Sequence, residues 1–344
     1  MTVLEEDRVF CTEILPKVSR TFALSIEMLP DDLRDAVKIA YLLCRIVDTI
    51  EDEPLLGIGD RHVLFDVFDR TMADDDVRVS LFEEAARTCG IGVGAERDLA
   101  TRAGAAFREF RALSDVQRRL IRPHVLEMSQ GMREYAVRTA KGRGLTLADT
   151  ADLERYCYFV AGTVGNLLTD LFLATLPELP IGPQFALRER AVSFGLGLQL
   201  VNIVKDVAED AERGVCFLPQ AIADARGIAL KDVLDPRVRP QALAMVADVC
   251  DLARTHLHKA VEYTLFWPAP QANAIRQFCA VPLALALATL QLVETSPDTL
   301  VRGKNPKISH ATVAHLLQGT HRAVGDNAAL AAVFAGATRP VPQP

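Results

Sequence analysis

The sequence predicts an all-α protein built as a single large helical domain, and three observations support this. Apolar residues recur at helical spacing through most of the 344 residues, and no run alternates convincingly with period two. Prolines and glycines mark the joins between the periodic segments, without a long linker or a low-complexity block. Hydrophobic residues make up 50% of the chain and charged residues 24%, as in ordinary globular proteins. We therefore expect one domain over residues 1–344, with a flexible tail at 337–344.

The first strongly periodic helix is expected between the start signal at Asp31 and Asp32 and the stop signal at Pro54. Its apolar face repeats at i, i+3, i+4, i+7, i+8 and i+11 and consists of Ile39, Leu42, Leu43, Ile46, Val47 and Ile50. The same periodicity predicts further helices at about 60–74, 96–120, 124–140, 150–176, 184–212, 239–264, 270–295 and 308–335.

Two features disturb this helical pattern. Pro282 is expected to kink or end its helix, because an interior proline costs about 3 kcal/mol. Gly162 and Gly165 remove side chains from one helix face, and the pattern favours close helix packing there over a groove for a long apolar ligand.

Composition excludes several classes of protein. A net charge of -7 argues against non-specific nucleic-acid binding, so an anionic substrate would need a local cation. Seven scattered cysteines indicate reduced thiols in a cytosolic protein, not a disulfide framework. The uncharged stretch Gln277–Val293 is short of the ~20 residues of a membrane span and contains Pro282. A buried core helix is the better interpretation, so we expect a cytoplasmic protein with at most peripheral membrane contact.

Two acidic clusters carry the chemistry that we predict. Asp48, Glu51 and Asp52 end one expected helix, and the second D-x-x-E-D copy, at 206–210, ends another. Acids at i, i+3 and i+4 share one helix face, where they repel each other and oppose the helix dipole. A divalent cation between them would remove both penalties, and Mg²⁺ prefers carboxylates, waters and substrate phosphates.

The alternative interpretation is that each cluster is only a solvated acidic helix end without a metal. Two copies of the same pattern make this interpretation less convincing than one copy would. A di-iron bundle would use Glu-x-x-His, and no histidine lies near either cluster. Possible phosphate donors share the faces of the clusters: Arg45 precedes Asp48 by one turn, and Gln199 and Asn202 precede Asp206. Ser19-Arg20-Thr21 offers a guanidinium and hydroxyls that also suit phosphate.

Taken together, these residues resemble the squalene/phytoene synthase family of head-to-head prenyl transferases over about residues 15–320. The markers are Ser19-Arg20-Thr21-Phe22, Tyr41–Asp52, Tyr156–Gly165 and Gln199–Asp210. Within the family, Tyr156-Cys157 with Val-Ala-Gly and the segment from Phe278 look most like squalene synthases, while Asp210-Ala-Glu-Arg-Gly looks more like the bacterial phytoene and dehydrosqualene branch. The resemblance implies the isoprenoid-synthase fold with a central active-site cavity, in a soluble bacterial-type form.

The resemblance also implies a reaction and a set of site residues. Two farnesyl diphosphates would condense with Mg²⁺ to presqualene diphosphate, which NADPH would then reduce to squalene. Metal ligands would be Asp48, Glu51, Asp52, Asp206, Glu209 and Asp210. Substrate-binding residues would be Ser19, Arg20, Phe22, Arg45, Val160, Val164, Leu168, Gln199, Asn202, Lys205, Arg213 and Phe278. Tyr156, with Tyr41 nearby, would assist proton removal, although a phenol with a pKa near ~10 needs a final acceptor such as diphosphate.

The reductive step depends on the least specific segment. Arg302, Lys304 and Lys307 lie in a stretch that resembles the family's basic segment associated with NADPH, but Ser309 and His310 stand where squalene synthases often carry more basic residues. One alternative is therefore an enzyme that stops at presqualene diphosphate, or makes dehydrosqualene or phytoene without hydride transfer. A second is a non-catalytic helical protein that binds prenyl lipids, against which the intact acidic clusters speak.

Overall fold

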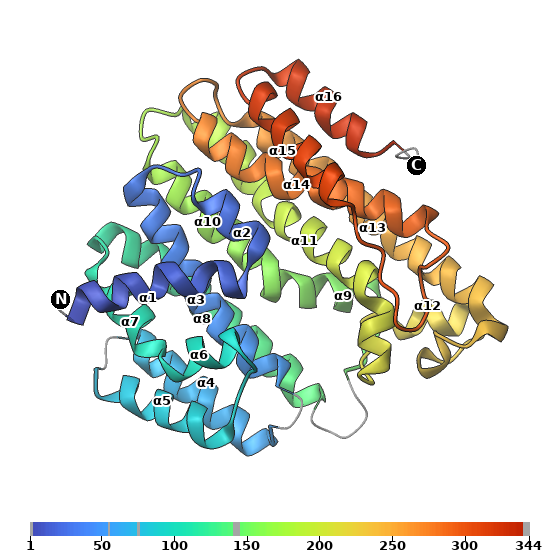
Figure 1. Cartoon of the computed structure of the whole chain (residues 1–344), viewed down its shortest axis with the longest axis horizontal. Coiled ribbons are helices and arrows are strands. Elements are labelled where there is room, and N and C mark those ends of the chain that lie inside the picture. Colours follow the sequence, from blue (N-terminus) through green and yellow to red (C-terminus); the bar gives the residue numbers. More distant parts are fainter. Residues whose placement is uncertain (1–2, 54–55, 74–75, 140–144, 340–344) are drawn as a thin grey trace. The chain divides into compact units, whose positions relative to one another are not determined.

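The computed structural model describes residues 3–53, 56–73, 76–139 and 145–339, and Figure 1 shows that they form helices and connecting turns. No strand occurs in these ranges, which confirms the all-α prediction. The chain divides into two compact units, residues 1–141 with 166–179 and residues 142–165 with 180–344.

The first unit is organised around α3 (Asp31–Asp52). Its other helices are α1 (Val3–Val18), α2 (Arg20–Ile26), α4 (Ile58–Met72), α5 (Asp76–Cys89), α6 (Ala95–Thr101), α7 (Ala103–Ala112), α8 (Asp115–Thr139) and most of α10 (Thr163–Ala174). Helix α3 contacts α1, α4, α6, α7 and α8, so it forms the centre of the unit. Leu42, Leu43 and Ile46 are fully buried, and the predicted apolar face of this helix is confirmed.

The second unit is built on α11 (Ile181–Glu212), which packs along α13 (Arg239–Phe266) and α14 (Asn273–Thr295) (Figure 1). The unit also contains α9 (Thr150–Cys157), the π-helical turn η1 (Tyr158–Gly162), α12 (Gln220–Ala225), the 3-10 turns η2 (Leu230–Asp232) and η3 (Pro236–Val238), α15 (His310–Ala323) and α16 (Asn327–Ala337).

Glycines bring α11 into close contact with the turn η1 and the residues that follow it. A Cβ atom on Gly165 would lie 2.1 Å from the carbonyl oxygen of Ala191, and one on Gly195 would lie 2.1 Å from that of Ala161. Backbone atoms cannot yield at such distances, so both positions exclude any side chain. This confirms the predicted packing role of Gly165, and at Gly162, the other predicted glycine, a Cβ atom would lie 3.0 Å from the Leu196 side chain.

Several expected helix boundaries were wrong. Of the two alternatives for Pro282, an end of the helix is wrong, because α14 continues through it, as the helix expected over 270–295 does, and packs on α11, α13, α15 and α16. Pro123 likewise lies inside α8, whereas the break expected near it falls at Leu113 and Ser114. Helices α1 and α5 were not expected at all. The proposed tail is helical as far as Ala337, and residues 340–344 lie outside the described part of the chain.

Three helical stretches are long and apolar enough to cross a membrane, judged by length and composition: Thr150–Ala174, Ile181–Glu212 and Asn273–Thr295. In each, more than half of the most apolar window (56%, 67% and 67%) is buried inside the protein. Gln277 and Phe278 are among the buried residues of α14, which agrees with a core helix for the uncharged stretch. The seven cysteines are all unpaired thiols.

Candidate active site

The first acidic cluster lies at the end of α3, beside the apolar face of that helix. Tyr41, Arg45 and Asp48 follow each other at i, i+4 and i+7, and each is half-buried. Asp52, one turn further, is exposed. The helix therefore presents one stripe to the core and a neighbouring stripe of polar side chains at its margin, as the sequence predicted.

Arg45 is the cation of this stripe. Its guanidinium forms an ion pair with Glu96, at the start of α6, and lies 3.6 Å from Oδ2 of Asp48. Burial raises the pKa of Asp48 to about 7, and the charge of Asp52 adds to this, while Arg45 opposes it. Burial and the Asp52 charge also hold the pKa of Glu51 well above its usual range. The protein thus keeps carboxylates together where their charge is unfavourable.

The end of α3 is held by the loop that precedes α6. The amide of Gly92 donates to Oε2 of Glu53 at 2.9 Å, and Gly92 has a φ of +72°. A Cβ atom there would lie 2.9 Å from the side chain of Thr49 and 2.9 Å from the Arg97 nitrogen. The loop is therefore packed directly on the last turn of α3. Neither this contact nor the role of Glu96 was expected, although three alternating glycines at 90–94 were a visible signal of an unusual turn.

A second group in this unit surrounds Tyr41. Its ring lies 5.7 Å from that of Phe22, and burial raises its pKa, an effect that a hydrogen bond with Ser19 opposes. The Ser19 hydroxyl also accepts a hydrogen bond from the Phe22 amide and so caps α2. The unit thus joins Ser19, Phe22 and Tyr41 into one cluster. The side chain of Arg20 lies outside the described part of the structure.

The second acidic cluster ends α11 in the other unit. Asp206 is half-buried and lies 3.1 Å from the Lys205 ammonium, while Glu209 is exposed. Asp210 is buried at 5% exposure and pairs with Arg213. Burial raises the pKa of Asp210 to about 6, with the Arg213 ion pair opposing the shift. Gln199 is half-buried and Asn202 exposed on the preceding turns.

The predicted basic segment contacts this second cluster. Nδ2 of Asn305 donates to Glu209 at 2.7 Å and to Asp206 at 3.3 Å. The Gly303 amide donates to Glu212 at 2.9 Å, and the Lys304 ammonium pairs with Asp298 at 2.7 Å. Arg302 and Lys307 are exposed, as is Lys304. The sequence indicated the three cationic residues of this segment as binding residues. It gave no reason to single out Asn305, because the acids that Asn305 contacts are about one hundred residues away in the sequence.

Tyr156 is buried at 4% exposure and stacks on Phe217, with ring centroids 5.2 Å apart. Phe217 was not among the predicted site residues. Val160 and Val164 are half-buried in the same unit, and Leu168 is half-buried in the other. Phe278 is only 1% exposed, within the core of its unit. The central cavity and the substrate contacts of these residues remain predictions.

Each acidic cluster offers carboxylates that suit Mg²⁺ when waters and substrate phosphates supply the other ligands. Within the described ranges, no three His, Cys, Asp or Glu side chains stand close enough together to hold a metal ion alone. Their acids contact Arg45, Lys205, Asn305 and Arg213 instead. Mg²⁺ usually takes only one or two protein carboxylates and completes its shell with waters and substrate phosphates. A cluster of mutually repelling, partly buried carboxylates is a fitting donor set for that arrangement.

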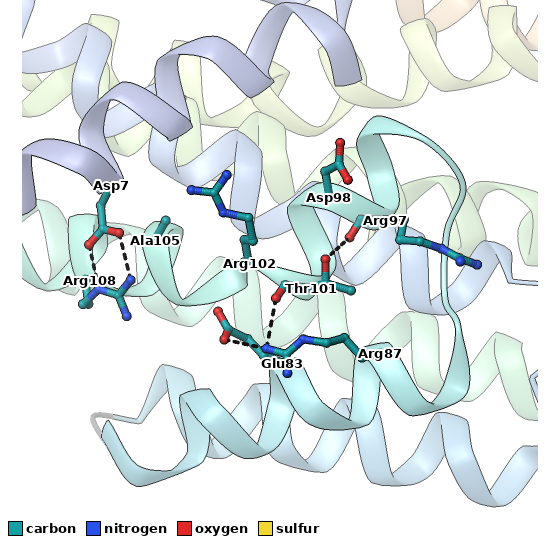
Figure 2. Close-up of a pocket in the computed structure, with 9 residues that line it drawn as sticks. All are labelled: Asp7, Glu83, Arg87, Arg97, Asp98, Thr101, Arg102, Ala105 and Arg108. Carbon is teal, nitrogen blue, oxygen red and sulfur yellow. Dashed lines mark hydrogen bonds and ion pairs between the residues drawn. The ribbon is translucent and has the colours of Figure 1, made fainter. Parts of the chain in front are cut away.

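A separate cavity lies elsewhere in the first unit and contains none of the predicted site residues. Figure 2 shows that the cavity is lined mainly by arginines and acids from α1, α5, α6 and α7. The volume of the cavity is about 470 Å³. Arg108 forms two hydrogen bonds to Asp7, of 2.6 and 2.8 Å, and Arg87 pairs with Glu83 at 3.1 Å. These charges largely satisfy each other, so the cavity does not compete with the acidic clusters as the candidate active site.

Comparison with known proteins shows which family the chain is similar to. The family model described as squalene/phytoene synthase matches residues 15–312. The squalene synthase of Schizosaccharomyces pombe is 32% identical over 290 residues, which cover 84% of this chain and 60% of that protein. Squalene synthase BSS of Botryococcus braunii is 30% identical over 326 residues, covering 91% of this chain and 64% of the relative. The chain therefore spans less than two thirds of the length of these curated relatives.

Solved structures extend the comparison to the fold. A complex of TcSQS with the ligand BPH1237 superposes with a TM-score of 0.81 at 27% identity, covering 96% of this chain and 90% of that one. A dehydrosqualene synthase, also solved with a ligand, has a TM-score of 0.62 at 21% identity and covers 92% of this chain and 95% of its own. The latter likeness concerns the fold alone. Together these matches confirm the predicted isoprenoid-synthase fold.

Proposed function

The chain belongs to the squalene/phytoene synthase family, and on this premise we propose that it is a squalene synthase. It would join two farnesyl diphosphates head to head to presqualene diphosphate and reduce this product to squalene with NADPH. The observation that carries the proposal is the pair of D-x-x-E-D helix ends, in which burial raises the pKa of Asp48 and Asp210. A protein that maintains such carboxylates at two helix ends has a use for their charge.

Magnesium would be held by the six carboxylates Asp48, Glu51, Asp52, Asp206, Glu209 and Asp210. When bound, the metal neutralises charge on the diphosphate leaving group and so favours ionisation of the allylic C1–O bond. The protein's own contribution is to keep these oxygens at two helix ends and to supply cations beside them. Arg45 is already oriented by its ion pair with Glu96.

Diphosphate oxygens would be bound by donors near each cluster, namely Ser19, Arg20, Arg45, Gln199, Asn202, Lys205 and Arg213. Lys205 and Arg213 pair with Asp206 and Asp210, so an incoming anion would compete for cations that lie close to the acids. A guanidinium suits this role because it binds two phosphate oxygens at once.

Tyr156 would assist removal of the proton whose loss closes the cyclopropane ring, and Tyr41 would be a second phenol for this step. Burial of Tyr156 against Phe217 supports an apolar, water-poor surrounding for the carbocation. Aromatic and aliphatic side chains would line that surrounding, namely Phe22, Val160, Val164, Leu168 and Phe278. Released diphosphate would be the final proton acceptor, because a phenol is a weak acid.

NADPH would place its phosphate against Arg302, Lys304 and Lys307, which are exposed on one short segment. The alternative products are presqualene diphosphate, dehydrosqualene and phytoene, which need no hydride. The Ser309 hydroxyl caps α15, so this position, basic in many squalene synthases, here has a structural role. Since squalene is insoluble in water, we propose a cytoplasmic enzyme with at most peripheral contact with the membrane that receives it.

One assay separates these products. Purified protein is incubated with farnesyl diphosphate and Mg²⁺, with and without NADPH, and the lipids are separated by mass. Squalene that forms only with NADPH supports the proposal. The same non-squalene product in both samples would contradict the reductive step, and a preference for geranylgeranyl diphosphate would indicate phytoene synthesis. Absence of any condensation product in all samples would favour a non-catalytic prenyl-binding protein.

A further inference from the structure

The segment at residues 301–309, which we call the strap, lies between Leu300 and helix α15 and crosses the end of α11. Its first end is fixed by Arg239, whose guanidinium donates to the carbonyl oxygens of Pro297, Thr299 and Leu300 at 2.8, 2.8 and 3.1 Å. Its other end is fixed by the cap that Ser309 provides for α15. Between these points, Pro306 is buried, and hydrogen bonds from Gly303 and Asn305 attach the strap to α11.

The backbone at the base of the strap adopts a costly conformation. Leu300 has a φ of +62°, in the left-handed region that non-glycine residues rarely enter. Its side chain is buried at 5% exposure, so packing and the Arg239 contacts hold it there. Gly303, with a φ of +68°, provides a second bend just before Asn305. The strap thus has two bends next to the residues that grip the acidic cluster.

Asn305 presents its amide nitrogen to two carboxylates of that cluster. Nδ2 lies 2.7 Å from Oε2 of Glu209 and 3.3 Å from Oδ1 of Asp206. The two acids stand at i and i+3 at the C-terminal end of a helix, where they repel each other and the dipole disfavours them. A donor between them eases this repulsion, as a cation would do more strongly.

We propose that Asn305 stands in for the divalent cation at the second acidic cluster, so that metal binding displaces Asn305 and releases the strap. The inference rests on the proposed function, because it takes Asp206 and Glu209 as metal ligands. Nδ2 lies within hydrogen-bond distance of both oxygens, and a Mg²⁺ ion that bridged these oxygens at about 2.1 Å would occupy the position that the amide now holds. The two states are therefore exclusive.

Release of the strap has a consequence for the order of binding. The exposed cations Arg302, Lys304 and Lys307 all belong to this segment. While Gly303 and Asn305 hold α11, the strap stays next to the carboxylates of the acidic cluster, whose negative charge would repel an anionic cofactor. Metal loading removes this hold, so an anionic cofactor would bind the strap after the metal and not before it.

The test uses Mn²⁺ as the probe, in a chain whose first cluster is disabled by Asp48→Asn and Asp52→Asn so that only the second cluster reports. Free Mn²⁺ is measured by electron paramagnetic resonance with inorganic diphosphate present. Asn305→Ala is expected to bind Mn²⁺ about tenfold more tightly, because the competing hydrogen bonds to charged groups are lost. Ile308→Val, a conservative change on the same strap that leaves Asn305 and both anchors of the strap intact, should bind Mn²⁺ as the parent does.

Hydrogen exchange provides a readout that does not depend on activity. Mn²⁺ with diphosphate should accelerate exchange of the Gly303 amide in the parent chain, whereas in Asn305→Ala exchange should be fast before metal is added. Equal or weaker Mn²⁺ binding by Asn305→Ala would overturn the inference, as would unchanged exchange on metal binding. If Asp206→Asn binds Mn²⁺ as well as the parent, the metal assignment of the proposed function fails. Loss of binding in Asp206→Asn with no gain in Asn305→Ala overturns the inference alone.

Discussion

The two acidic helix ends share the pattern D-x-x-E-D, yet the structure surrounds them differently. At the end of α3, acids are partly buried, the neighbouring Arg45 is held by Glu96, and the loop with Gly92 is packed on the last turn. At the end of α11, Asp210 is buried but Glu209 is exposed, as Asp52 is at the first end, and the acids contact Lys205, Arg213 and the amide of Asn305. The first end is organised in advance, whereas the second is held by contacts that a ligand can replace.

This difference matters because preorganised groups lose little free energy when a ligand binds, while replaceable contacts make binding conditional. The end of α3 would therefore be the more constant of the two acidic ends, and the end of α11 the one that responds to conditions. The following predictions test that contrast, from the largest expected effect to the smallest.

Removal of a metal ligand should have the largest effect. Asp48→Ala and Asp206→Ala should each lower turnover of farnesyl diphosphate by at least about a hundredfold while leaving the helical circular dichroism spectrum unchanged. Because the end of α11 is the more adaptable one, high Mg²⁺ should restore part of the activity in Asp206→Ala but not in Asp48→Ala. Full activity in either variant would refute the metal assignment, and equal rescue of both would remove the contrast.

A matched pair of glycines tests how tightly each end is packed. Gly92, next to the end of α3, and Gly214, just after α11, have φ values of +72° and +81°. An alanine forced into this left-handed backbone conformation lowers the free energy of unfolding by about 1 kcal/mol at either position. Gly92→Ala should cost about 1–2 kcal/mol more, because its Cβ would meet backbone and Thr49, whereas the Cβ at Gly214 meets open space. Urea denaturation of both variants measures the difference, and equal costs would show that the loop at Gly92 yields.

The ion pair that orients Arg45 is expected to affect substrate binding. Glu96→Gln leaves Arg45 without its strongest partner, so the KM for farnesyl diphosphate should rise about tenfold with a smaller change in kcat. Glu96→Asp should recover part of this loss. Lys205→Met, at the other end, should change the KM by less than about threefold, because the partner of Lys205 is the adjacent Asp206 and not a residue that orients it from another helix. A larger effect in Lys205→Met would reverse the proposed ranking of the two ends.

The smallest effect concerns stability without metal. Burial raises the pKa of Asp48 to about 7, so above this pH the ionised carboxylate destabilises the folded chain. At about pH 8 and without divalent cations, Asp48→Asn should therefore raise the free energy of unfolding by about 1 kcal/mol. Asp206→Asn should change it by no more than about 0.5 kcal/mol, because Asp206 is half-exposed and paired with Lys205. Thermal unfolding in the presence of a chelator provides the measurement.

The helices that carry the acids were predictable because their apolar residues repeat regularly. The same rule would have found α1, where Asp7, Phe10, Cys11, Ile14 and Leu15 are buried at helical spacing, but Pro16 and the acidic start obscured it. Pro282 lies inside the helix expected over 270–295, because packing on the four neighbouring helices α11, α13, α15 and α16 outweighs its local cost.

Within the candidate site, the sequence singled out the acids at the two helix ends but not their partners from distant segments. Asp48 and Asp206 follow from periodicity, because their neighbours in sequence are also their neighbours in space. Glu96, Phe217 and Asn305 reach the site through connecting segments or short helices whose path depends on the whole unit. Local spacing holds no information about such long-range partners.

The π-helical turn η1 at Tyr158–Gly162 has a consequence for how this region changes by insertion or deletion. A turn of this kind accommodates about one residue more than an α-helical turn, and each residue advances an α-helix by about 100°. Tyr156 precedes this turn in the sequence and Val164 follows it. The angle between their side chains around the helix axis therefore cannot be taken from an α-helical wheel. Deleting one residue within η1 would restore regular pitch but rotate every side chain beyond it. In this segment, therefore, a deletion would change the chemistry presented by the helix more than most substitutions would.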